Sequence, residues 1–192
     1  MSSTKFLLIA IATLGFGDAV SADTKPEKLD TKKLSSTPAP ELAALSKFFV
    51  GSWHCEGSTT PVPGVGKTFA SKNNTTWALA LDGFWIGGTT EGEKVPGMPL
   101  PTVFKGESRL TYDRVAKQYV NFAVGNRGGF TSVTSKGWEG DKLIWAGSAS
   151  GVIKTETRST ITKKGDKEFK VVGERMEDGK WVVGADETCK KK

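Results

Sequence analysis

Turn signals at short intervals constrain the fold of this chain more than any other feature. They stand at Leu81-Asp82-Gly83, Gly128-Gly129, Gly140-Asp141, Gly165-Asp166 and Asp178-Gly179-Lys180, and Tyr112-Asp113 begins a further one. The runs between them are rich in Thr, Val, Phe and Trp, with apolar and polar residues alternating. Such alternation between tight turns is typical of antiparallel strands joined as hairpins. We therefore predict an all-β domain of about ten strands after residue 52.

The N-terminal residues are typical of a secretory signal peptide. Lys5 provides the positive charge, and residues 6–17 are apolar or small but too few for a stable membrane-spanning helix. Small residues at Val20-Ser21-Ala22 predict cleavage after Ala22, which makes residues 1–22 the signal. The alternative is a helix that stays attached as an anchor. We expect a soluble mature protein, periplasmic or secreted, without a membrane span.

The mature chain is predicted to hold one linker and one domain. Residues 23–39 contain mainly Lys, Asp, Thr, Ser and Pro, which predicts a flexible linker. The domain then spans residues 40–192. It begins with a short amphipathic helix, because Leu42, Leu45 and Phe49 recur at helical spacing and Pro40 suits a first helical turn. We expect this helix to cap one end of the β domain.

The two cysteines lie at opposite ends of the strand series. Cys55 is in the first run, Cys189 is in the last, and the sequence has no other cysteine. Exported proteins favour disulfides, so we predict a Cys55–Cys189 bridge; two buried free thiols are the alternative. In a sheet that closes on itself the first and last strands are neighbours, and closure removes exposed edges. The fold class predicted is a single antiparallel up-and-down β-barrel whose seam carries the disulfide.

One internal segment is incompatible with a central strand. Residues 93–101 contain three prolines, Pro96, Pro99 and Pro101, and proline cannot donate a hydrogen bond to a neighbouring strand. We predict a loop that is either a lid at the barrel mouth or an edge crossing.

The positive charge of the chain lies mostly outside the predicted fold. Of the formal net charge of +6, residues 190–192 supply three charges and residues 23–47 supply one, which leaves +2 for the folded part. A nucleic-acid-binding protein concentrates positive charge on its folded surface. We therefore expect no nucleic-acid partner.

Several short motifs together resemble a known family. They are Phe49-Val50-Gly51-Ser52-Trp53, Leu81-Asp82-Gly83-Phe84-Trp85, Gly106-Glu107-Ser108-Arg109-Leu110-Thr111-Tyr112-Asp113, Lys117-Gln118-Tyr119-Val120, Gly137-Trp138-Glu139-Gly140-Asp141-Lys142-Leu143 and the closing Cys189. Their order resembles a bacterial family of exported proteins catalogued as a domain of unknown function (number fifteen-seventy-nine). That family is similar to the lipocalin-like calycins and, among them, to nitrobindin-type barrels. The resemblance implies a barrel with a central cavity and a tryptophan, here Trp53, plugging the barrel base. It implies no activity.

The chain departs from nitrobindin-type barrels at the haem ligand. Those proteins bind haem through a histidine in the last strands, whereas the single histidine here, His54, is in the first strand. Strand alternation places Trp53 and Cys55 on one face and His54 on the other. We predict neither haem nor any other cofactor.

The residue pattern gives little support for a catalytic site or a metal site. A lone histidine without placed partners is a poor catalyst or ligand, and no nucleophile-elbow pattern occurs. A zinc site would need both cysteines reduced. The sequence therefore predicts no enzyme activity, no catalytic residue and no metal.

Aromatic residues within the predicted strands are the best candidates for ligand contacts. A barrel of this size either fills its interior with side chains or keeps a cavity for one ligand, and both outcomes use the same aromatics. An anionic head group could be anchored by Arg109, Arg127, Arg158 or Arg175, and Arg127 lies in the preferred rim run of residues 126–130. The ligand-binding residues we predict are Trp77, Trp85, Phe122, Arg127, Phe130 and Trp145.

Two functions are compatible with this pattern. The first is a binding module that holds a small apolar or amphipathic ligand inside the barrel. The alternative is a filled barrel that acts as an envelope protein-interaction or inhibitor module without a small ligand. The sequence identifies neither the ligand nor a protein partner.

Overall fold

The computed structural model describes residues 37–62, 64–151 and 153–192. The predicted signal peptide and most of the predicted linker lie outside these residues. Helix α1 (Pro40–Phe49) is followed only by strands. They are β1 (Gly51–Thr59), β2 (Phe69–Ala80), β3 (Trp85–Gly92), β4 (Lys105–Asp113), β5 (Gln118–Gly125), β6 (Phe130–Ser135), β7 (Trp138–Glu139), β8 (Lys142–Ser150), β9 (Thr155–Lys163), β10 (Glu168–Glu177) and β11 (Lys180–Lys191).

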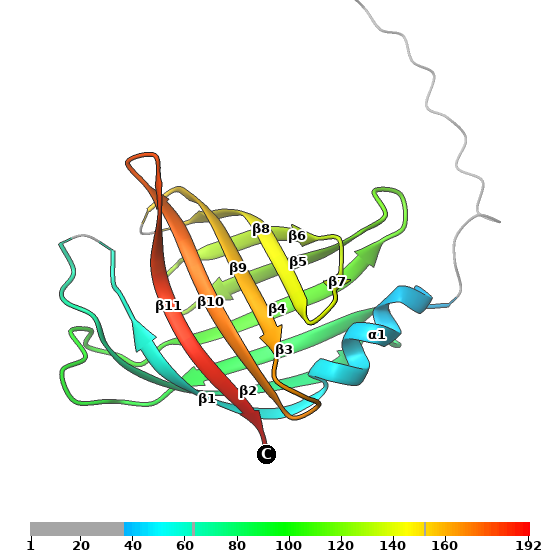
Figure 1. Ribbon diagram of the computed structural model, residues 1–192, viewed down its shortest axis with the longest axis horizontal. Coiled ribbons are helices and arrows are strands. Elements are labelled where there is room, and N and C mark those ends of the chain that lie inside the picture. Colours follow the sequence, from blue (N-terminus) through cyan, green and yellow to red (C-terminus); the bar gives the residue numbers. More distant parts are fainter. Residues whose placement is uncertain (1–36, 63, 152) are drawn as a thin grey trace, which may run out of the picture. The chain divides into compact units, whose positions relative to one another are not determined.

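The strands form one closed antiparallel barrel, as predicted (Figure 1). Each long strand pairs with its neighbours in the chain, β1 pairs with β11, and β6 pairs with β8. Ten strands therefore make the wall, and the two-residue β7 is an addition beside β8. Cys55 and Cys189 are direct partners in the β1–β11 register and form the predicted disulfide.

Residues at the predicted turns adopt positive-φ backbone conformations, which favour glycine and aspartate. The β2–β3 turn runs through positive φ at Leu81, Asp82 and Gly83. The β10–β11 turn does so at Asp178 and Gly179. Only glycine enters this region at no steric cost, and asparagine and aspartate tolerate it better than other residues. Local chemistry thus sets the hairpin positions.

Helix α1 closes one end of the barrel, as predicted (Figure 1). Its apolar residues Leu42, Leu45, Phe48 and Phe49 are all buried in the core. The Trp53 indole Nε1 donates to the Phe49 carbonyl at 2.7 Å, and the Tyr119 hydroxyl donates to the Glu41 carbonyl at 2.8 Å. These bonds attach the first turn of the helix to β5 and its last residue to β1.

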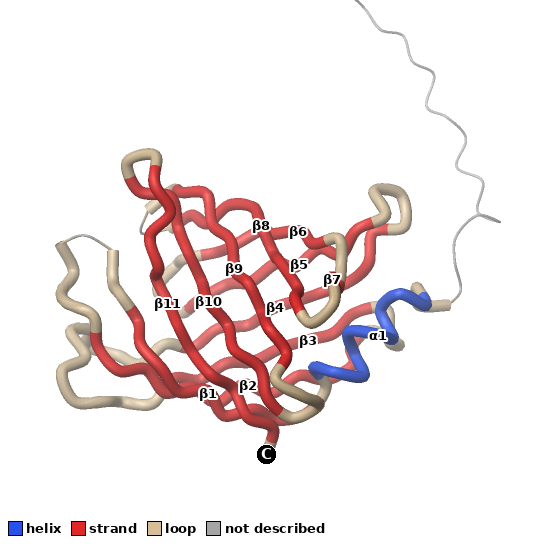
Figure 2. Tube along the Cα trace, in the orientation of Figure 1, coloured by secondary structure: helices blue, strands red, loops and turns tan. Residues whose placement is uncertain are grey.

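The opposite end of the barrel, called the mouth below, is formed by connecting segments. Figure 2 shows the segments 60–62 and 64–68 and the loop 93–104 extending from the end away from α1. The proline-containing segment 93–104 is a loop between β3 and β4 and contains no strand. A ligand that enters the barrel would do so from this side, because α1 and its aromatic contacts fill the other.

Candidate functional site

The base of the barrel is packed with aromatic rings. Trp53 is fully buried, its ring centroid lies 4.8 Å from that of Phe169, and Phe48 lies 5.2 Å from Trp138. The expectation that Trp53 plugs the base is confirmed. Interior space for a ligand therefore begins above this layer, nearer the mouth.

A cavity of about 190 Å³ lies above the aromatic base, and we call it the central cavity. Its apolar lining is Phe49, Trp77, Leu110, Val133, Trp145 and Ile161, and its polar lining includes Asn121, Thr131, Thr157 and Ser159. These residues come from α1 and from strands on opposite sides of the barrel. The cavity combines an apolar wall with a few hydrogen-bonding groups, which is the composition of small-molecule sites.

Asn121 gives the central cavity a directional polar group. The residue lies on β5, opposite Leu110 of β4 and Val133 of β6. Its carbonyl oxygen Oδ1 is buried and has no hydrogen-bond partner among the described residues. A buried acceptor without a donor is costly, so a donor brought by a ligand would relieve that cost.

A second cavity, of about 260 Å³, lies at the mouth, and we call it the mouth cavity. The loop 93–104 contributes Val95, Met98, Leu100 and Phe104 to its lining. Glu187 on β11 and Arg127 in the β5–β6 turn bring opposite charges to the lining, which also includes Lys72 and Glu93. Of the two alternatives predicted for the proline-containing segment, a lid at the mouth or an edge crossing, this position agrees with the first, and residues 93–104 are called the lid below.

The Glu187 carboxylate is held by two donors on β2. Its Oε1 accepts from the Ser71 hydroxyl and from the Asn73 amide nitrogen, each at 2.7 Å. Burial raises the pKa of Glu187, the negative charge of Asp186 adds to the rise, and the bonds from Ser71 and Asn73 oppose it. Among the described residues, the Glu187 carboxylate is thus held by two neutral donors and forms no ion pair, although Arg127 and Lys72 line the same cavity.

Three of the predicted ligand-binding residues lie on interior cavities. Trp77 and Trp145 line the same central cavity, although 68 positions separate them in the sequence. Arg127 lines the mouth cavity, where its guanidinium donates to the Thr102 carbonyl of the lid. The structure thus brings the two tryptophans together and places Arg127 at a different level of the barrel.

The other three predicted ligand-binding residues, Trp85, Phe122 and Phe130, line neither of these two cavities. Phe122 is 48% exposed and Phe130 is 52% exposed; Phe130 lines a cleft of about 270 Å³ at the rim. Trp85 stands at the start of β3 next to the inward-facing, buried Ile86, so it faces outward. Phe122 also faces outward, because its neighbour Asn121 lines the central cavity. Trp85 and Phe122 therefore line neither the central cavity nor the mouth cavity.

The remaining candidate arginines serve local contacts. Arg109 pairs with Glu107. Arg158 is among the residues that line the central cavity, but its guanidinium forms two hydrogen bonds with Glu174 and lies over the Trp181 ring. Arg175 donates to the carbonyls of Thr60 and Pro61, which fixes the β1–β2 loop at the mouth.

His54 lies on the outer wall, as strand alternation predicts. Its ring nitrogens contact Asn74 Oδ1 and Glu56 Oε1, each at 3.1 Å. The hydrogen bond to Glu56 is the main cause of a raised His54 pKa, and the bond to Asn74 adds to it. Among the described residues, no group of three or more His, Cys, Asp or Glu side chains is placed to hold a metal ion.

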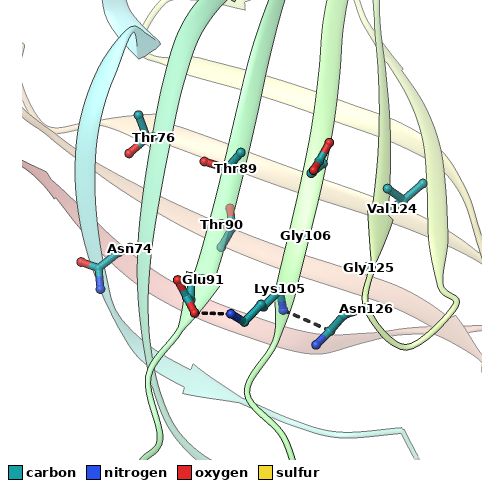
Figure 3. A pocket seen from close by; sticks show the side chains of 11 residues that line it. Asn74, Thr76, Thr89, Thr90, Glu91, Lys105, Gly106, Val124, Gly125 and Asn126 are labelled. Carbon is teal, nitrogen blue, oxygen red and sulfur yellow. Dashed lines mark hydrogen bonds and ion pairs between the residues drawn. The ribbon is translucent and has the colours of Figure 1, made fainter.

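A larger hollow, of about 560 Å³, lies on the outside of the barrel over β2–β5 (Figure 3). Its side chains are mostly polar, and the charges of Glu91 and Lys105 pair with each other at 2.6 Å. Asn126 accepts from the Lys105 amide at 3.1 Å. Because these polar groups already satisfy one another on an exposed wall, the interior cavities are the better candidates for a ligand site.

Sequence reasoning missed Asn121 and the group of Glu187, Ser71 and Asn73. A signal for Glu187 was present, since it stands two residues before Cys189 and therefore faces the same way as the buried disulfide. No comparable signal marks Ser71 or Asn73, because their contact with Glu187 depends on the register of three strands.

Comparison with family models and with curated proteins finds no match for this chain. In the described part of the chain, no helix has the length and apolarity needed to cross a membrane.

Proposed function

We propose that this chain is an exported barrel that binds a small amphipathic molecule in its central cavity. The observation that carries the proposal is the buried, unpaired Asn121 Oδ1 in a cavity walled by Trp77 and Trp145. The ligand would place an apolar ring against the tryptophans and donate one hydrogen bond to Asn121.

The volume of the central cavity limits the size of the ligand. An engineered apolar cavity of about 150 Å³ accepts benzene, so about 190 Å³ suits a single ring with one substituent. Larger lipids would need the lid and the upper barrel to open.

Export remains part of the proposal. It rests on the signal-like residues 1–22, and the Cys55–Cys189 disulfide is compatible with an oxidising compartment. The proposed family relationship adds the expectation of a ligand cavity but no ligand. The proposal includes no catalytic step, because His54 contacts Glu56 and Asn74 on the outer wall and lines neither cavity.

The direct test compares two ring compounds of similar shape, phenol and toluene. Phenol can donate to Asn121 and toluene cannot, so we expect phenol to bind more tightly by roughly fivefold or more. Tryptophan fluorescence and proton NMR of the indole groups would follow the titration. Asn121→Leu should remove the preference for phenol while toluene still binds.

A cavity-filling variant separates interior binding from surface binding. Ser159→Phe places a ring in the central cavity and should abolish the binding of both compounds. Ser148→Phe is the matched control, because Ser148 is exposed on the neighbouring strand β8. Unchanged phenol binding by Ser159→Phe, in a variant that keeps its fold, would contradict the proposal.

The second candidate function is an interaction module that acts through its surface. It is favoured by Phe122, Val124 and Phe130, which are all about half exposed on β5 and β6, with Val124 directly opposite Phe130. Phe122→Ser combined with Phe130→Ser should then abolish capture of a protein from the export compartment without changing phenol binding.

A further inference from the structure

Gly57 allows Glu187 to reach across a strand. The two residues are direct partners on β1 and β11, and Gly57 is also the direct partner of Ser71 on β2. A Cβ atom on Gly57 would lie 2.0 Å from the Asp186 carbonyl oxygen and 2.7 Å from the Glu187 Cα, so no side chain fits there. The Glu187 side chain passes over this glycine to the donors on β2.

The two donors use only one carboxylate oxygen. Ser71 and Asn73 both donate to Oε1, and Oε2 receives no hydrogen bond from the described residues. Because Glu187 lines the mouth cavity, Oε2 is the oxygen available to a bound molecule.

In the part of the chain that the structure describes, neither cation that lines the mouth cavity pairs with Glu187. Lys72 pairs with Glu56 at 2.8 Å, and Arg127 donates to the Thr102 carbonyl. The other acidic groups nearby are Asp186, which pairs with Lys170 on the outer wall, and Glu93 at the start of the lid. A partly buried carboxylate without a cation is unfavourable, and a cation brought into contact with it offsets part of that penalty.

The lid supplies an apolar surface opposite the carboxylate. Val95 is only 8% exposed, and Met98, Leu100 and Phe104 line the same cavity. Both ends of the lid are anchored, since the Gly92 amide donates to the Phe104 carbonyl and the Glu93 amide to the Lys72 carbonyl, each at 2.8 Å. The apolar wall is therefore held in place above Glu187.

We propose that the mouth cavity is a binding site for a small organic monocation, a primary ammonium with a compact apolar body. The ammonium donates to Glu187, and the apolar body packs under Val95, Met98 and Leu100. A second positive charge on the ligand is disfavoured because Arg127 and Lys72 line the same cavity. A metal ion is disfavoured because, among the described residues, no group of three or more His, Cys, Asp or Glu side chains is placed to hold one. The site does not depend on the central cavity or on the proposed function.

Isothermal titration calorimetry with three six-carbon compounds tests the charge preference. Hexylammonium, hexanol and hexanoate differ only in the head group. We expect saturable binding of hexylammonium to the full mature chain at neutral pH, with hexanol weaker by roughly tenfold or more, since a hydrogen bond to a charged group is worth more than a neutral one. Tighter binding of hexanoate would overturn the proposal, as would no detectable hexylammonium binding.

Two variants that each remove one negative charge locate the site. Glu187→Gln keeps an acceptor for Ser71 and Asn73 and should weaken hexylammonium binding by roughly tenfold or more. Asp186→Asn removes the neighbouring charge on the outer wall and should change the affinity less than twofold. Equal effects of the two variants would overturn the assignment to Glu187.

Two further measurements keep the test decisive. If Glu187→Gln does not fold, carboxyl carbon NMR of the unmodified protein should show the Glu187 pKa falling when hexylammonium saturates the site; an unchanged pKa would overturn the proposal.

Ser159→Phe, which fills the central cavity, should leave hexylammonium binding intact. Loss of phenol binding with retained hexylammonium binding would thus separate the two sites.

Discussion

Cys55 and Cys189 lie directly opposite each other on β1 and β11, so their disulfide joins the first and last strands of the barrel. The bridge closes a loop of 134 positions. Hydrogen bonds and a covalent bond therefore close the barrel at the same place.

Removal of this disulfide should destabilise the barrel without changing its fold. In the double variant Cys55→Ala and Cys189→Ala, we expect the free energy of unfolding to fall by about 2–5 kcal/mol, because the unfolded chain regains the freedom of a long loop. Urea unfolding would measure the change. Reduction of the unmodified protein should shift the midpoint in the same direction, and an unchanged midpoint in both experiments would contradict the role of the bridge.

Substitution of Gly57 should destabilise the barrel more than substitution of another strand glycine. A Cβ at Gly57 would lie 2.0 Å from the backbone of β11, whereas at Gly173 the nearest atom is 3.7 Å away. We expect Gly57→Ala to cost about 1–3 kcal/mol or more and Gly173→Ala to cost much less. Thermal unfolding of the two variants side by side would measure the difference, and equal costs would show that the strands separate easily at Gly57.

The Trp53 indole is expected to stabilise the contact between α1 and the barrel. Trp53→Phe keeps an aromatic ring but removes the donor to the Phe49 carbonyl. The expected cost is about 1–3 kcal/mol, because a buried carbonyl loses its partner. Trp85→Phe is the control, since Trp85 faces outward and is partly exposed. A midpoint that falls equally in both variants would mean that the hydrogen bond contributes little.

Protonation of His54 should stabilise the fold in a defined pH range. Its bonds to Glu56 and Asn74 raise its pKa above the ordinary value of 6.5, with Glu93 adding to the rise. The stabilisation is therefore fully present below pH 6.5 and is lost as pH rises through the raised pKa. The groups around the ring are Glu56, Glu93 and Asn74, and Asn74 also accepts from Lys192.

The measurement for this prediction is the unfolding midpoint from about pH 5 to about pH 9 for the unmodified protein and for His54→Gln. The difference between the two midpoints should be largest at the acidic end of the range. A difference that does not vary with pH would show that the ion pairs of His54 are too exposed to matter.

Local patterns in the sequence determined the strands, the turns and the helix. Positive-φ turns such as Leu81-Asp82-Gly83 need no distant contact, and the helical spacing of Leu42 and Leu45 already marks the buried face of α1. The Cys55–Cys189 pair followed from compartment chemistry and from the closure of an even strand series. These features depend on residues close in the chain or on a single pairing, and for that reason the sequence predicted them.

The interior sites depended on the tertiary structure. Successive side chains in a strand point to opposite faces of the sheet. The sequence does not show which of the two faces is the interior, so it could not tell that Asn121 faces inward and its neighbour Phe122 outward. The contact of Glu187 with Ser71 spans 116 positions and needs the registers of both β1–β11 and β1–β2. The sequence by itself therefore determined the barrel and its seam, whereas which residues meet inside it was decided by closure, which brings distant strands into register around a common interior.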